Sequence, residues 1–204
     1  MPTPRRTQKQ RRDQAEAALL AAAAELVEQG VHSLTLARVG ERAGYSRGII
    51  AHHFGSKQAL LELLARTAQA GFVPGLADLP PGLDRLLRLI DGYIGELGQV
   101  GAARHAFLLL WAEAPTMPEL APIFRERDET FRADLRVEVA AGIADGTIRD
   151  DLAPEEVAPA IVGQLRGIGL QRLLDPPAVD TERLRRSVTE QWRRALATPS
   201  ARQP

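Results

Sequence analysis

The segment that decides the fold is LTLARVGERAGYSRGIIAHHFGSKQALLELL, residues 34–64. It predicts two short helices, over residues 35–43 and 46–53, with Gly44 in the turn between them. A threonine and a serine, both common helix N-caps, precede the two helices, and glycine adopts the positive φ that a tight turn requires. We therefore expect a helix-turn-helix, whose second helix enters the major groove of DNA.

Apolar residues on the two short helices are expected to pack together and against a longer helix before them. These residues are Leu36, Val39, Ala43, Ile49, Ile50 and Phe54. The polar or small residues of the second helix remain available to face DNA, which is read through base edges in the grooves.

The rest of the chain also has helical periodicity, and no segment alternates as a strand would. Nine helices are expected, over residues 8–29, 35–43, 46–53, 56–72, 82–98, 102–114, 116–144, 154–174 and 180–197. The Gly- and Pro-rich stretch GFVPGLADLPPG, residues 71–82, interrupts the pattern. The predicted fold class is therefore all-α.

Composition and charge exclude several classes of protein. There is no cysteine, so neither disulfides nor thiolate metal sites are expected, and no apolar run is long enough to cross a membrane. The start lacks the apolar core of a signal peptide, which makes the cytoplasm the expected location. Residues 1–58 hold nine Lys and Arg against five Asp and Glu, which favours contact with a polyanion, although so modest an excess also arises by chance.

The segment 34–64 resembles the DNA-binding domain of the TetR family of bacterial regulators. The resemblance is carried by Thr35, Ala43-Gly44, Ser46-Arg47-Gly48, His53-Phe54 and Ser56-Lys57. It implies a DNA-binding domain over residues 1–55, including a basic N-terminal arm, and a helical effector-binding and dimerisation domain over residues 56–200. It also implies that the chain is not an enzyme and has neither cofactor nor metal.

The resemblance further implies which residues touch double-stranded operator DNA. They are Thr35, Tyr45, Ser46, Arg47, Gly48, His52, His53 and Lys57. Arg47 is the best candidate for reading a guanine edge, and Gly48 lets the backbone approach. His53 and Lys57 are expected at phosphates. Basic residues at the start of the chain either add phosphate contacts or are merely solvated.

Two departures from the family pattern stand out. Ala51 occupies a position where the family usually has a phosphate-contacting Tyr, so we hypothesise that Tyr45 supplies that contact. Gly40 replaces a common Ala, which is expected to weaken its helix slightly.

The second domain is expected to form a homodimer and to hold a small-molecule effector. The dimer candidates are Val157, Ile161, Leu165, Ile168, Leu184, Val188 and Trp192. The effector candidates are Tyr93, Arg104, His105, Phe107, Trp111 and Phe131. Both sets have an alternative interpretation as ordinary core residues. A two-fold dimer predicts a pseudo-palindromic operator, and repression is the family default.

Two other functions were weighed against DNA binding. An enzyme is disfavoured because the helices carry no Glu-x-x-His pair and no Gly-rich phosphate loop follows a strand. A helical adaptor would use the same fold for protein contact, and salt-dependent binding to duplex DNA distinguishes the two.

Overall fold

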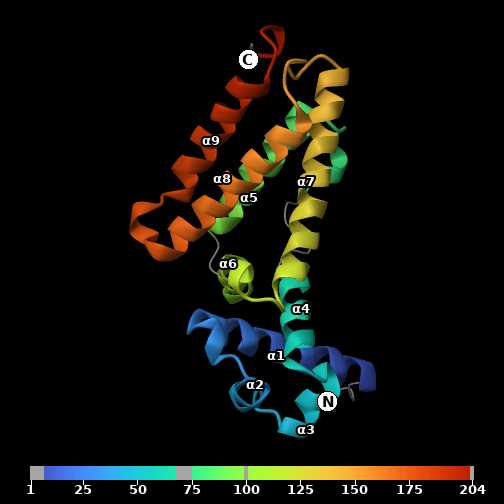
Figure 1. Cartoon of the computed structure of the whole chain (residues 1–204), viewed down its shortest axis with the longest axis vertical. Helices are drawn as coiled ribbons and strands as arrows, with labels where there is room; N and C mark the ends of the chain where they lie inside the picture. The colour runs from blue at the N-terminus through green and yellow to red at the C-terminus, as the bar shows by residue number, and fades with distance from the viewer. Residues whose placement is uncertain (1–6, 68–74, 99–100, 203–204) are drawn as a thin grey trace, which may run out of the picture. The chain divides into compact units, whose positions relative to one another are not determined.

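The computed structural model describes residues 7–67, 75–98 and 101–202, apart from the side chains of Arg47, Thr67 and Ala77. The described residues form nine α-helices (Figure 1). These are α1 (Gln8–Glu28), α2 (Leu36–Ala43), α3 (Arg47–Phe54), α4 (Lys57–Thr67), α5 (Leu83–Leu97), α6 (Ala102–Glu113), α7 (Ala121–Ala144), α8 (Pro154–Leu174) and α9 (Thr181–Leu196). The all-α prediction is confirmed. No helix in this part of the chain is long and apolar enough to cross a membrane.

The helices gather into two compact units. The N-terminal unit holds α1 to α4 and α6, and the C-terminal unit holds α5, α8, α9 and all but the first residues of α7. This grouping differs from the predicted boundary at residue 55, because α6 packs against α1 and α4 although it is distant in sequence. His105 of α6 is 2.7 Å from Glu28 of α1, measured from Nδ1 to Oε1.

The core of the N-terminal unit lies along one face of α1. Leu19 and Val27 of that helix are fully buried, as are Val39 of α2 and Leu60 of α4. Thr7 begins α1 with a capping box, in which its side chain accepts from the Gln10 amide and the Gln10 side chain accepts from the Thr7 amide. The helices α2, α4 and α6 all pack on α1.

In the C-terminal unit, α5 packs against both α8 and α9 (Figure 1). An ion pair joins α5 to α9, with Arg185 Nε 2.8 Å from Asp91 Oδ1. This hydrogen bond raises the pKa of Arg185 above its ordinary value. An isolated antiparallel bridge between Ile148 and Ala197 fixes the end of α9 to the loop after α7.

One predicted helix start is wrong. The sequence predicts a helix over residues 116–144, but α7 begins at Ala121. The Thr116 hydroxyl instead donates to the carbonyl of Glu113, 3.0 Å away, and residues 114–116 form a 3-10 turn. The threonine is therefore engaged with the preceding helix and does not cap the next one.

The helices α2 and α3 approach each other closely at Gly40. A Cβ at Gly40 would lie 2.0 Å from Ile50 Cδ1 and 2.8 Å from the Tyr45 carbonyl oxygen. Ile50 is fully buried, and the Tyr45 oxygen is backbone, so neither can retreat easily. The sequence assigned Gly40 only a small helix penalty, whereas the structure gives it a packing role.

We predict that Gly40→Ala destabilises the protein even though alanine is the better helix former. Overpacking of this kind costs about 1–3 kcal/mol, against a propensity gain of about 1 kcal/mol at most. Urea denaturation followed by circular dichroism measures the net change. Gly48→Ala in α3 is the matched control, because its Cβ would meet only Ser46 Oγ at 4.0 Å. Equal stability of the two variants would contradict the packing role.

Candidate nucleic-acid interface

The turn between α2 and α3 is fixed by backbone bonds and one glycine. The Thr35 hydroxyl caps α2 by accepting from the Arg38 amide at 3.2 Å. Gly44 ends α2 with φ 74°, and the Tyr45 amide then donates to the Gly40 carbonyl at 2.8 Å. This left-handed position favours glycine, so the sequence interpretation of the turn is confirmed.

Ser46 stands at the N-cap position of α3. Contrary to the prediction, its side chain does not cap that helix. Among the described residues its hydroxyl makes no capping hydrogen bond, and the side chain is exposed. The hydroxyl is thus available to an external partner.

α3 buries one face and exposes the other. Ile50 and Phe54 are buried at i, i+4 spacing, whereas Gly48 and His52 are exposed. Ile49 was expected in the core, but it is 40% exposed, because the buried stripe is too narrow to include it. Sequence reasoning therefore missed Ile49 as a surface residue beside Gly48 and His52.

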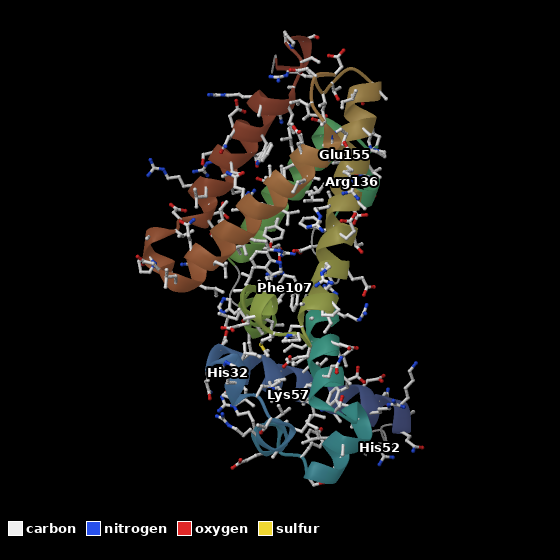
Figure 2. The ribbon with its side chains drawn as sticks, in the orientation of Figure 1. His32, His52, Lys57, Phe107, Arg136 and Glu155 are labelled. Atoms are coloured by element: carbon white, nitrogen blue, oxygen red, sulfur yellow. The ribbon has the colours of Figure 1, made fainter. Side chains whose placement is uncertain are left out.

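Other predicted contact residues also lie on the surface of the N-terminal unit. Thr35 is exposed, and Tyr45, His53 and Lys57 are partly exposed. Figure 2 shows His52 on α3 and Lys57 in the first turn of α4. The side chain of Arg47 lies outside the described part of the structure, although its backbone forms the first residue of α3.

The start of α4 is a candidate phosphate contact. The Ser56 hydroxyl accepts from the Ala59 amide at 3.0 Å and so caps the helix. Lys57 follows at once, on a helix of 11 residues. The partial positive charge of the helix N-terminus and the ammonium group act in the same direction on an anion.

The arginines of α2 are engaged within the unit. Arg42 Nη2 is 2.6 Å from Glu25 Oε2 of α1. Arg38 Nη1 donates to the Ser33 carbonyl at 2.9 Å. These contacts join α2 to α1 and to the segment that precedes α2.

The basic residues of the predicted N-terminal arm fall into two groups. Arg5 and Arg6 lie outside the described residues. Lys9, Arg11 and Arg12 are exposed within the first turns of α1, so they belong to a helix and not to an extended arm.

The predicted effector residues are divided between the two units. Arg104, His105, Phe107 and Trp111 lie on α6, where Phe107 is buried and His105 pairs with Glu28. Tyr93 of α5 and Phe131 of α7 come together in the C-terminal unit, with stacked rings whose centroids are 6.3 Å apart.

Arg166 of α8 joins Tyr93 and Phe131, and sequence reasoning missed it. Its side chain is only 1% exposed, and its Nη1 donates to the Tyr93 hydroxyl at 2.7 Å. The available signal was an arginine directly following Leu165 inside an otherwise apolar stretch of helix. A fully buried arginine is rare in proteins unless it is paired, so such a position is a candidate functional residue.

The dimer residues predicted on α8 need correction. Val157, Ile161, Leu165 and Ile168 are buried within the chain itself, so they offer no surface to a second copy. On α9, Val188 is buried, while Leu184 and Trp192 are partly exposed. Trp192 Nε1 donates to Gln164 Oε1 of α8 at 2.6 Å.

The exposed face of α8 is formed by other residues. It carries Ala160, Gly163, Gln171 and Leu174, with Gly167 half-exposed beside them. Apart from adjacent residues and the backbone of α8 itself, no described atom lies within 4 Å of a Cβ built on Gly163 or Gly167. This face ends at Leu174, which is 87% exposed.

Two family matches cover most of the chain. Residues 18–64 match the family described as bacterial regulatory proteins, tetR family. Residues 82–197 match the family described as BetI-type transcriptional repressor, C-terminal. The second match alone covers more than half of the 204 residues.

Curated relatives named HTH-type transcriptional regulator BetI align with the chain. The relative from Ectopseudomonas mendocina is 29% identical over 178 residues, which cover 82% of this chain and 86% of that protein. The one from Vibrio campbellii is 28% identical over 163 residues, covering 76% and 78%. The one from Stenotrophomonas maltophilia is 32% identical over 115 residues, and the chain spans only 58% of that protein's length.

Solved structures show the same fold. NalD from Pseudomonas aeruginosa superposes with a TM-score of 0.77 at 20% identity, covering 93% of this chain and 98% of that one. A putative regulator from Saccharomonospora viridis, in complex with choline, has a TM-score of 0.74 at 20% identity, covering 91% and 99%. The chain is thus a DNA-binding transcriptional regulator of the TetR family, with a C-terminal region of the BetI type.

Proposed function

We propose that the chain is a repressor that binds a pseudo-palindromic operator as a homodimer and is released by a small-molecule effector. The observation that carries the DNA-binding part is the exposed face of α3, held by the buried Ile50 and Phe54 on the opposite face. Such a repressor acts in the cytoplasm, where its operator is.

Each residue on the α3 face has a distinct role in this proposal. Arg47 donates to a guanine edge, and Gly48 lets the helix backbone approach the groove. Ile49 offers an apolar contact to a thymine methyl group, which polar neighbours cannot replace. Tyr45 and Lys57 bind phosphates on either side of the helix and set its register.

The proposed dimer uses the exposed face of α8 around Gly163 and Gly167. A glycine inside a helix costs about 1 kcal/mol relative to alanine, and among the described residues no neighbouring helix or side chain requires a glycine at Gly163 or Gly167. A helix from a second copy that lies close against Gly163 and Gly167 would explain why these positions are glycine. A two-fold arrangement then presents two α3 helices to successive turns of DNA.

The proposed effector binds the C-terminal unit. The choline complex of the Saccharomonospora regulator supports a small organic molecule as the kind of ligand that this fold accommodates. Binding relieves repression only if the effector binds the DNA-incompetent state more tightly than the competent state. The chemical class of the effector depends on the residues of this chain.

We predict different losses for base-reading and phosphate-binding variants. An unbiased selection of bound duplexes first defines the operator. Arg47→Ala should then cost about 1–3 kcal/mol on the matched operator and relax the preference at one base pair. Lys57→Ala and Tyr45→Phe should weaken all duplexes uniformly, and Lys57→Ala should lower the salt slope by about one.

Fluorescence anisotropy at several salt concentrations measures these effects. Arg38→Ala is a matched control, because it removes a cation that is engaged within the unit. If Tyr45→Phe binds the operator as tightly as the wild type, the Tyr45 hydroxyl does not supply the phosphate contact that is missing at Ala51. If Lys57→Ala leaves the salt dependence of binding unchanged, Lys57 does not contact a phosphate.

Gly48→Ala separates DNA approach from folding. Because the structure leaves room for a Cβ at Gly48, we expect thermal stability to be kept or slightly raised. The added methyl group stands between α3 and the groove, so operator affinity should fall at least tenfold. Full operator affinity in the folded variant would show that the backbone does not approach DNA at this residue.

Gly163→Leu tests the dimer face. Gly163 is exposed, and a Cβ at this position would meet no described side chain or neighbouring helix of its own chain, so the subunit should fold. We expect it to weaken dimerisation at least tenfold in analytical ultracentrifugation and to abolish tight binding to the full operator. Ala140→Leu, at an exposed position of α7, is the control. An unchanged dimer would place the interface elsewhere.

A further inference from the structure

Within the C-terminal unit, three helices bring a cation, two aromatic rings and a carboxylate together. The guanidinium carbon of Arg166 lies 5.8 Å from the ring centroids of both Tyr93 and Phe131. The two rings are nearly parallel, with an angle of 13° between their planes. Arg166 Nη2 is 3.3 Å from Asp128 Oδ1 of α7.

This set of groups is the kind that binds an organic cation. Aromatic faces attract a positive charge placed within about 6 Å of the ring centroid, and the attraction grows when water is excluded. The Asp128 carboxylate balances the charge, and the Tyr93 hydroxyl oxygen accepts a hydrogen bond from Arg166 Nη1. In this chain the cation in that position is the guanidinium group of Arg166.

Packing alone does not explain an arginine at this position. Its neighbours along α8, Leu165 and Ile168, are buried apolar residues, and an apolar side chain of similar volume would continue their stripe. Replacing buried charges by apolar groups is often neutral or stabilising, so stability alone does not account for a buried arginine at this position.

We propose that Arg166 determines effector specificity by filling a cation site from within the protein. The site then rejects quaternary ammonium and other small organic cations, which would have to compete with a tethered guanidinium for the same rings and carboxylate. This inference rests on the proposed role of the C-terminal unit in effector binding. Loss of the guanidinium would leave a cavity between Tyr93, Phe131 and Asp128 that accepts such a cation.

Two substitutions at one position test the proposal. Arg166→Ala opens the cavity, and Arg166→Met keeps most of it filled by an uncharged, flexible side chain of comparable volume. Each variant and the wild type are titrated with tetramethylammonium chloride and with methylguanidinium chloride, using sodium chloride at equal ionic strength as the reference. Calorimetry gives the Kd, and thermal unfolding gives an independent readout.

We expect only Arg166→Ala to bind the two cations. With a cation at ten times its Kd, the Tm of a protein of this size should rise by about 3–6 °C. Adding Asp128→Asn to Arg166→Ala should weaken binding at least tenfold, because the balancing carboxylate is lost. Arg166→Met and the wild type should show no shift beyond that of sodium chloride.

Several results would overturn the proposal. Binding of tetramethylammonium to the wild type as tightly as to Arg166→Ala would show that Arg166 does not block the site. A folded Arg166→Ala that binds neither cation would show that no cation site exists. If Arg166→Ala does not fold alone, methylguanidinium must restore its helical circular dichroism, and failure to do so counts equally against the proposal.

The readout is independent of DNA. Cation binding and Tm are measured without operator, whereas the proposed repressor function is measured by operator binding of the wild type. A wild type that binds operator while Arg166→Ala binds no cation rejects only the specificity proposal. If the wild type binds no operator, the proposed repressor function is rejected, and the result of the cation titrations can still be interpreted.

Discussion

The N-terminal unit depends on one apolar face of α1. The helices α2, α4 and α6 all pack on this helix, and its core residues are excluded from water almost completely. Polar contacts at its edges then fix the partners, with Glu25 paired to Arg42 of α2 and Glu28 to His105 of α6. These exposed pairs contribute little energy individually, so burial along α1 provides most of the stabilisation while the pairs select the register.

Local signals in the sequence were sufficient for the helix-turn-helix. The predicted segments 35–43 and 46–53 agree with α2 and α3 to within one residue, because Thr35 and Gly44 act on their own backbone neighbours. The predicted capping role of Ser46 is wrong, since the hydroxyl of a serine at an N-cap position need not accept a hydrogen bond from the first turn of the helix.

Tertiary choices were harder to predict from the sequence. On α8 both a bulky stripe and a small-residue stripe have helical spacing, and the sequence does not say which one faces inward. The structure buries the bulky stripe, since larger side chains gain more from leaving water, and exposes Gly163. Arg166 was missed for a related reason, because periodicity treats an arginine among apolar residues as a break and gives no information on what surrounds it.

The close approach at Gly40 has a consequence for redesign. Recognition helices are often exchanged between relatives to change the DNA sequence that is read. Here Ile50 of α3 fills the space that a side chain on α2 would need. A graft that replaces α3 alone would leave a void or a clash, depending on the residue that arrives at position 50. The helices α2 and α3 therefore have to be exchanged together when the operator specificity is changed.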